Sequence, residues 1–158
     1  DACMKFLRQS GWINFRMRAM IMSFASYNLW QPWQATSPML AQLFVDYEPG
    51  IHICQVQMQS GVTGINLPRI YSVTKQSRDQ DPNAEWMKKI LPELRSFAPN
   101  EIHRAGLKGK YLDKIVDLEE TGKIARDRIW SMRKDSEFKK IARSVYLLHG
   151  SRKTARRY

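Results

Sequence analysis

Charged side chains in the first third of the chain have the types and the spacing to do chemistry. Arg16 and Arg18 lie near the start of one apolar stretch, and Asp46 and Glu48 lie at the end of the next, shortly before His52. If these stretches are helices packed antiparallel, Arg18 and Asp46 meet at one rim. A buried charge without a partner is costly, so we predict that the two form an ion pair. Such a pair is either purely structural or part of a binding site.

The two elements before these acids are predicted by apolar residues at helical spacing. We expect a short helix over residues 1–8, stopped at Gly11, because glycine is common just past a helix end. A long helix should follow from Trp12 to Trp30 and end at Pro32. Arg16 and Arg18 are two residues apart and therefore point to different faces of this helix.

The acids themselves are expected at the end of a third helix. Ser37 as N-cap and Pro38 at the first position favour a helix that runs to Glu48, where Pro49 and Gly50 stop it. Residues 51–59 alternate glutamines with Cys54, Val56 and Met58. Taken locally, this period of two favours a strand.

The rest of the chain is expected to form helices separated by irregular segments. Proline, glycine and polar residues predict long loops over residues 60–82 and 106–114. Helices or helical turns are expected over residues 83–91 (with Asn83 as cap), 99–103, 117–134 (with a weak centre at Gly122) and 136–148, followed by a frayed tail over 151–158. The predicted class is all-α, a helical bundle-like fold with long irregular loops.

Composition indicates one domain of a protein that works in water. The chain has 158 residues, 43% of them hydrophobic, and a mean hydropathy of −0.50. No stretch approaches the roughly 20 apolar residues of a membrane span. Cys3 and Cys54 make neither a disulfide framework nor a metal site, so we expect no metal and a reducing, cytoplasmic location. The chain opens without Met or a signal peptide, and we expect it to be a fragment of a longer protein.

Positive charge is concentrated at the C-terminal end. Residues 121–158 hold 12 Lys or Arg and 3 Asp or Glu, which accounts for +9 of the total +11. We therefore divide the chain into residues 1–134 and a basic helix and tail over 135–158. Such an end suits contacts with nucleic-acid phosphates, although a solvated tail that keeps the protein soluble is the alternative.

Several short motifs, in order over residues 3–117, carry a resemblance to a known family. They are Cys3-Met-Lys-Phe-Leu-Arg-Gln-Ser-Gly-Trp12 followed by Arg16-x-Arg18, Leu29 to Trp33, Asp46-Tyr-Glu48, Arg69-Ile-Tyr71 with Gln76, Asp81-Pro82, Pro92-Glu93-Leu94 and Ile115-Val-Asp117. Together they resemble the photolyase and cryptochrome family, in the second half of its C-terminal helical FAD-binding domain. The light-harvesting α/β domain of that family and the first half of its helical domain are absent from this chain.

The resemblance implies FAD as cofactor, folded in a U between the two halves of the domain. The FAD site of this chain alone should therefore be incomplete, with the missing N-terminal part of the same protein as a partner. Arg18 resembles the family arginine that pairs with the first acid, Asp46, against the flavin ring. Glu48 takes the place of an aspartate that bonds the ring edge. Residues 51–59 correspond to a helix of that family, so we expect a helical turn or an irregular segment there in place of the strand.

Two further residues receive roles from the resemblance. His52 takes the position that faces flavin N5, where it could donate a hydrogen bond or a proton, although an ordinary structural histidine is the alternative. Trp33 resembles a relay in the family's tryptophan chain, which carries electrons from the surface to the flavin, although core packing is the common fate of a tryptophan. The relay is altered here, because Val56 replaces the tryptophan nearest the flavin.

The substrate positions also depart from the family pattern. Phe15 replaces the asparagine that binds substrate, and Met58 replaces a tryptophan that stacks on a flipped base pair. We expect Trp12, Asn14, Phe15, Arg16 and Met58 to form the DNA-binding or substrate-binding surface, with Phe15 also among the FAD-binding residues.

The function implied by the resemblance is light-driven electron transfer from reduced FAD that repairs pyrimidine dimers in DNA, as in a deoxyribodipyrimidine photolyase. The alternative is a cryptochrome-like blue-light photoreceptor or a flavoprotein relative without repair activity. A DNA-binding module that has lost flavin is a third possibility. The expected partner is damaged duplex DNA, and we expect a monomer.

Overall fold

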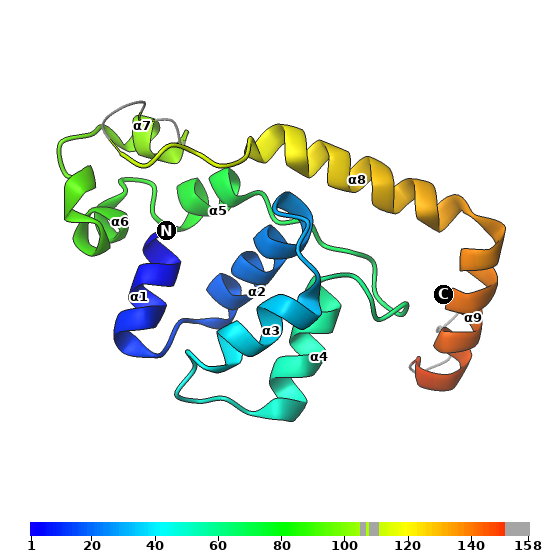
Figure 1. Ribbon diagram of the computed structural model, residues 1–158. Coiled ribbons are helices and arrows are strands. Elements are labelled where there is room, and N and C mark those ends of the chain that lie inside the picture. Colours follow the sequence, from blue (N-terminus) through cyan, green and yellow to red (C-terminus); the bar gives the residue numbers. More distant parts are fainter. Residues whose placement is uncertain (105–106, 108–110, 151–158) are drawn as a thin grey trace, which may run out of the picture.

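A computed structural model describes residues 1–104, 107 and 111–150, and it contains helices but no strand in this part of the chain (Figure 1). In chain order the elements are α1 (Ala2–Ser10), α2 (Phe15–Ser23), a π-helix η1 (Phe24–Asn28), α3 (Trp33–Ala41), α4 (Pro49–Gln59), α5 (Val73–Gln80), α6 (Glu85–Ile90), a 3₁₀ turn η2 (Pro92–Leu94), α7 (Pro99–His103), α8 (Leu118–Lys134) and α9 (Ser136–His149). The all-α prediction is confirmed.

The first helix ends as its sequence predicts, and the second begins later than predicted. Gly11 adopts a left-handed conformation with φ of 69° and donates its N–H to the Leu7 carbonyl at 2.8 Å. Helix α2 begins at Phe15 and not at Trp12, because the side chain of Asn14 accepts a hydrogen bond from the Met17 N–H at 3.0 Å. Asn14 is therefore the N-cap of this helix.

The long helix expected to reach Trp30 changes type at Phe24. Over residues Phe24–Asn28 the backbone forms a π-helix, in which Leu29 N–H bonds the Phe24 carbonyl at 3.1 Å. Trp30 then takes a positive φ of 53°, and Gln31 N–H reaches back to the Ala25 carbonyl at 2.9 Å. The helix thus ends before Pro32 in a turn that is wider than an α-helical turn.

The predicted start of the third helix is wrong. Helix α3 begins at Trp33, directly after Pro32, and it contains both Ser37 and Pro38. Ser37 is buried, with 3% of its surface exposed, and it contacts His52 of α4. The side chain of an N-cap residue would instead accept hydrogen bonds from backbone N–H groups. The helix also ends at Ala41, so Asp46 and Glu48 lie in the loop that follows and not in a helix.

Pro49 and Gly50, which were expected to stop the third helix, are the first two residues of α4. Pro49 occupies the first position of α4, where its missing N–H has no cost. Glu48 is the N-cap, and its Oε2 accepts from the Ile51 N–H at 2.6 Å. A Cβ on Gly50 would lie 3.2 Å from the same Oε2, so glycine leaves room for the cap. Residues 51–59 are helical, so the expectation of a helical turn there in place of a strand is confirmed.

The middle of the chain is more helical than the sequence predicts. The loop expected over residues 60–82 contains α5. Asn83 does not cap α6, because the Asp81 carboxylate accepts from the N–H groups of Trp86 and Met87 at 3.2 and 2.9 Å. Helix α7 lies where expected. His103, at the end of α7, joins it to α5 through a 2.6 Å contact between Nδ1 and Ser77 Oγ.

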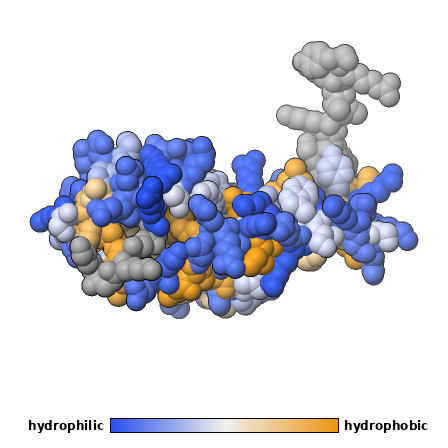
Figure 2. Space-filling view, turned by 90° about the horizontal axis from the view of Figure 1, so that it is seen from above, coloured by the Kyte–Doolittle hydropathy of each residue, from blue (hydrophilic) through white to orange (hydrophobic). Residues whose placement is uncertain are grey.

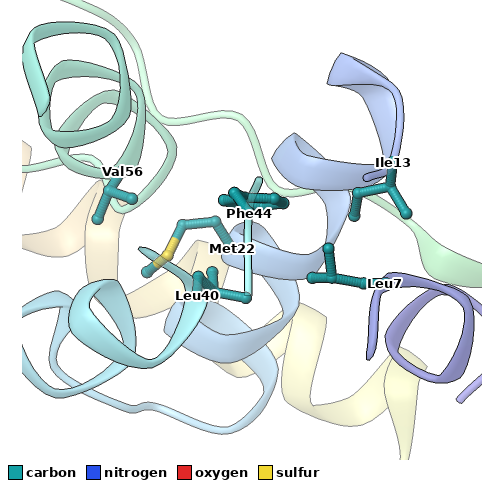
Figure 3. Close-up of a cluster of buried hydrophobic side chains, with 6 residues drawn as sticks. All are labelled: Leu7, Ile13, Met22, Leu40, Phe44 and Val56. Atoms are coloured by element: carbon teal, nitrogen blue, oxygen red, sulfur yellow. The ribbon is translucent and has the colours of Figure 1, made fainter. Parts of the chain in front are cut away.

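The core consists of two apolar clusters. Figure 3 shows the larger cluster, in which side chains from α1 to α4 meet: Leu7, Ile13, Met22, Leu40, Phe44 and Val56. The second cluster joins the start of α1 to the α6–α7 segment through Ala2, Ala84, Leu91, Leu94 and Ile102. The larger cluster fixes α2 and α4 relative to each other, and these two helices carry half of the predicted site residues.

Helices α8 and α9 form an arm along and beyond the small bundle (Figure 1). Helix α8 lies where residues 117–134 were expected to form one, with Asp117 as its N-cap, and Asn28 of the π-helix donates to Thr121 Oγ1 at 2.8 Å, which attaches α8 to the bundle. Helix α9 has no buried residue, and at the right of Figure 2 it extends past the rest of the molecule. The expected frayed tail over 151–158 lies outside the described residues.

No helix in the described ranges combines the length and the apolar character needed to cross a membrane.

Candidate functional site

A groove of about 290 Å³ lies between α2, the loop after α3 and one face of α4. Its walls are apolar and include Met22, Leu40, Phe44 and Val56. Polar side chains also line it, and they are Arg18, Asp46, Glu48, His52, Gln55 and Gln59. We call this the central groove. A planar aromatic ligand with one polar edge matches this division of surface.

The Arg18 side chain is held by contacts on several sides. Its Nε donates to the Ile13 carbonyl at 2.8 Å, and Nη2 lies 3.0 and 2.9 Å from the two carboxylate oxygens of Asp46. The guanidinium carbon also lies 4.1 Å from the centre of the Phe44 ring, in a cation–π contact. The predicted ion pair is therefore present. Nη1 makes no hydrogen bond to a described residue and remains able to bind a ligand.

The two acids differ in how their oxygens are used. Asp46 gives both oxygens to Arg18, and 47% of its side-chain surface remains exposed, against 26% for Arg18. Glu48 spends Oε2 on the cap of α4. The ion pair is thus partly solvated, and it lies at the rim of the groove because the loop after Ala41 places Asp46 there.

His52 has a defined ring orientation. Its Nε2 lies 3.0 Å from the Ser37 carbonyl and 3.1 Å from Ser37 Oγ. A carbonyl oxygen only accepts, so the contact at 3.0 Å is favourable when the proton sits on Nε2. Phe44 and Tyr47 contact the ring edge to face, with centroids 5.9 and 5.3 Å away. In the neutral ring, Nδ1 is then the acceptor.

Aromatic side chains form the rim of the groove. Trp12 and Phe15 both line it, and each leaves about half of its surface in solvent, 50% and 56%. Tyr47, between the two acids, is 42% exposed on the same rim. Exposed aromatic faces around a groove can stack on a flat ligand or base.

Four of the predicted site residues lie away from the groove lining. Asn14 caps α2, and Arg16 Nη1 donates to Gln76 Oε1 at 3.3 Å, which joins α2 to α5. Met58 is half-buried on another face of α4. Trp33 packs against the larger core cluster. The structure therefore brings together Trp12, Phe15, Arg18, Asp46, Glu48 and His52, but not these four.

Sequence reasoning missed three polar groove residues, Tyr47, Gln55 and Gln59. The two glutamines follow His52 at helical spacing, so a helical period over residues 51–59 would have placed them on its face. The period-two pattern concealed that face. Tyr47 had no signal beyond its place between two acids.

The described residues contain no group of three or more His, Cys, Asp or Glu placed to hold a metal ion. Burial raises the pKa of the Cys3 thiol, so this cysteine stays protonated and is a poor ligand.

Comparison with known proteins identifies relatives of this chain. Residues 1–131 match the family described as the FAD-binding domain of DNA photolyase. A deoxyribodipyrimidine photo-lyase of Thermus thermophilus is 28% identical over 133 residues, which cover 80% of this chain and 29% of that protein. A cryptochrome DASH of Solanum lycopersicum is 30% identical over 122 residues, covering 75% of this chain and 20% of the relative. The chain thus spans less than a third of the length of these relatives.

Solved structures agree with the family match. An archaeal photolyase from Sulfolobus tokodaii, described with two FAD molecules, superposes with a TM-score of 0.73 at 26% identity, covering 82% of this chain and 31% of that one. A Synechocystis cryptochrome gives the same TM-score of 0.73 at 21% identity, covering 80% of this chain and 29% of that one, and it supports the fold alone.

Proposed function

Because the chain belongs to the family of the FAD-binding domain of DNA photolyase, we propose that its central groove forms one wall of the FAD site in a light-driven DNA repair enzyme. The proposed reaction splits pyrimidine dimers in damaged duplex DNA. When bound in its reduced form, FAD supplies the electron that light drives into the dimer. The observation that carries the proposal is the Arg18–Asp46 pair at the polar edge of an apolar groove.

The donor set of the groove suits a flavin ring. Trp12, Phe15 and Ile51 line the groove with exposed apolar surface that suits a flavin ring. Arg18 offers a guanidinium to the ring edge that carries oxygen and nitrogen atoms. A groove of about 290 Å³ is at the lower limit of ligand sites, which run from roughly 300 to 1,000 Å³. It suits a ring system better than a whole dinucleotide. The isolated chain should therefore bind FAD weakly.

The residues at the groove have separable roles in this proposal. Arg18 stabilises negative charge on a reduced ring, because a fixed positive group acts strongly in a site that excludes water. Asp46 holds Arg18 in that orientation through both oxygens. His52, fixed through Nε2, presents Nδ1 as an acceptor when neutral and as a donor when protonated, and we propose that this atom faces flavin N5. Glu48 would bond the ring edge through the oxygen that its cap leaves free.

DNA is the proposed macromolecular partner. Exposed Trp12 and Phe15 would take the lesion at the rim, with Asn14, Arg16 and Met58 beyond it, and the basic unit over residues 135–158 would contact phosphates. Trp33 remains the proposed electron relay. We further propose a monomer that works in the cytoplasm.

A cryptochrome-like photoreceptor is the second candidate function. Val56 and Met58 stand where the family has tryptophans for the relay and for base stacking, and Phe15 stands where it has an asparagine. These positions favour a flavoprotein without repair activity. A cryptochrome among the relatives makes this candidate concrete.

Illumination of the purified protein with dimer-containing DNA separates the two candidates. The protein is supplied with reduced FAD and a duplex that carries one pyrimidine dimer, and the remaining dimers are counted after blue light. Repair predicts dimer loss that requires both light and FAD. Light-dependent changes in flavin absorption with every dimer intact would reject repair in favour of the photoreceptor.

A further inference from the structure

One groove residue carries a polar atom that the fold leaves without a partner. Gln55 lies on the face of α4 that lines the central groove, together with His52, Val56 and Gln59. The Oε1 atom of Gln55 is buried and has no hydrogen bond. Most buried polar side-chain atoms in proteins are hydrogen-bonded, so this one requires an explanation.

The location of this atom separates it from similar atoms elsewhere. The other buried oxygens without a partner in the described residues belong to Ser26, Tyr27, Asn28 and Thr63, and none of these residues lines the groove.

We propose that Gln55 is a positioning residue for FAD, and that its side-chain amide completes its hydrogen bonding with the bound cofactor. This inference rests on the proposed FAD site. FAD offers N–H donors on its flavin and adenine rings and hydroxyl donors on its ribityl chain, and the Gln55 carbonyl accepts from one of these. The unpartnered atom in the free protein becomes a satisfied one in the complex.

The place of Gln55 along the helix distinguishes its role from that of the charged pair. Seven residues separate it from Glu48 at the start of α4, which corresponds to about 10 Å along a helix axis. Arg18 and Asp46 lie at the charged end of the groove, near that start. Gln55 therefore contacts a different part of the cofactor from the part that Arg18 contacts.

The substitution Gln55→Met tests the proposal, because it keeps the length of the side chain and removes only the amide. We expect the melting temperature of the FAD-free protein to rise, since an unpartnered polar atom is replaced by an apolar one. We expect affinity for FAD to fall about tenfold, measured as the FAD-dependent rise in melting temperature up to millimolar FAD. The two changes have opposite signs, which a merely structural glutamine would not produce.

Gln57→Met is the matched control, because Gln57 is half-buried on the same helix but does not line the groove. It should leave FAD affinity unchanged. Equal losses in both variants, or a Gln55→Met protein with wild-type affinity, would overturn the proposal and leave the proposed function standing. A wild-type protein that does not respond to millimolar FAD would overturn this inference, because Gln55 then contributes no measurable affinity in this chain, and the illumination experiment would still test the proposed function. Parallel titrations with riboflavin and with ADP show which half of FAD carries the donor, since only that probe should lose affinity in Gln55→Met.

Discussion

Nη2 of Arg18 contacts both carboxylate oxygens of Asp46 in an ion pair that remains partly in water, and this exposure sets the expected size of its effect on stability. Removing one partner of a fully buried pair costs about 3–5 kcal/mol, whereas an exposed pair contributes about 0.2–1 kcal/mol. With side-chain exposures of 26% and 47%, we expect Asp46→Ala to lower the free energy of unfolding by about 1 kcal/mol, measured by urea denaturation. FAD binding should fall as well, because Arg18 loses its orientation.

Asp79→Ala provides the control for this prediction. Asp79 pairs with Lys75 on α5 at 3.5 Å, and 72% of the lysine side chain is exposed. This variant should change stability by no more than a few tenths of a kcal/mol and leave FAD binding intact. A decrease of about 3 kcal/mol or more in Asp46→Ala would show that the pair is far less solvated than its exposures indicate.

The residue types at the site could be predicted from the sequence, but the contacts that hold their side chains in place could not. Arg18, Asp46 and His52 carry charge or a titratable ring and belong to matching motifs, so they attract attention in a bare sequence. The Ser37 carbonyl that fixes the ring orientation of His52 is a backbone group, and every residue type has one, so the sequence gives no sign of this contact. Gln55 escaped for a related reason, since an unpartnered atom exists only once the chain around it is folded.

We expect alanine substitutions at Gly122 and at Gly11 to change stability in opposite directions. Gly122 lies in the interior of α8, where an added Cβ would meet Arg126 and Asn28 at 3.6 and 4.0 Å, an ordinary van der Waals distance. Gly122→Ala should therefore raise stability by about 1 kcal/mol, because alanine favours helix. Gly11 has a positive φ, and a Cβ there would collide with Val45. Gly11→Ala should lower stability by at least about 1–2 kcal/mol.

Thermal melts of the two variants beside the wild type test this pair. A destabilised Gly122→Ala protein would mean that α8 must approach the π-helix more closely than the structure places it. An unaffected Gly11→Ala protein would mean that the end of α1 can take another conformation without loss.

The cap of α8 makes part of the stability of the fold depend on pH. A hydrogen bond from Lys114 and the backbone N–H groups of Glu120 and Glu119 hold the pKa of Asp117 at about 2, below its ordinary value. A carboxylate with a lowered folded-state pKa stabilises the protein above its unfolded pKa near 4, and this contribution disappears as the pH falls through about 2. The melting temperature of the wild type should drop over that interval.

Asp117→Asn separates the charge from the cap, because asparagine is also a good N-cap. The melting temperature of this variant should lie below that of the wild type at neutral pH, and the difference should shrink between pH 4 and pH 2. A difference that stays constant with pH would rule out the Asp117 carboxylate as its source. Asp135 caps α9 in the same manner, and the Phe138 N–H lowers its pKa, so a residual acid effect is expected in Asp117→Asn.

Element boundaries could be predicted where one residue type is typical of one position, and not where several side chains compete to cap a helix. The end of α1 at Gly11 was placed correctly, whereas the sequence did not identify the caps Asn14, Glu48 and Asp117. Pro38 and Pro49 were misread, because proline is tolerated within a short helix and favoured at the first position of one. Whether a proline starts a helix or lies inside one depends on which neighbouring groups provide hydrogen bonds, and the packing of the folded chain determines those neighbours.

The arm of α8 and α9 gives the whole molecule a basic surface apart from the groove. Lys139, Lys140 and Arg143 are exposed on α9, which buries no residue of its own. A side chain that binds a phosphate releases counterions, so removing one such side chain should reduce the slope of log affinity against log salt by about 0.9 on duplex DNA. We predict that changing all three to alanine weakens DNA binding equally for damaged and undamaged duplexes, while flavin absorption is unaffected.

Changing Lys88 and Lys89 to alanine is the control for this experiment, because α6 lies at the opposite end of the molecule (Figure 1). The salt slope of this control should match that of the wild type. Truncation after Gly150 extends the test to Arg152, Lys153, Arg156 and Arg157. Parallel salt slopes in every version would reduce the basic end to a solubility device and favour the photoreceptor over repair.

The π-helix over Phe24–Asn28 connects the groove-bearing half of the molecule to the arm, since α3 follows it and Asn28 holds α8. A π-turn contains one residue more than the α-turn it replaces. Deleting Ser26 would let the segment revert to α-helix, but every later residue would be rotated by about 100°. We expect a large loss of ellipticity and of melting temperature on deletion. Ser26→Ala should be neutral or mildly stabilising, because it removes a buried hydroxyl without a partner.

The contrast between deleting Ser26 and replacing it with alanine indicates how the sequence of this segment can change during evolution. In most surface loops the number of residues drifts freely while a few identities are kept. At Phe24–Asn28 the number of residues is fixed, because the segment joins α2 at its start to the Asn28–Thr121 contact with α8 at its end, whereas identities other than Asn28 are less constrained. Insertions and deletions among natural variants should therefore avoid these five positions and accumulate in the loop between α4 and α5.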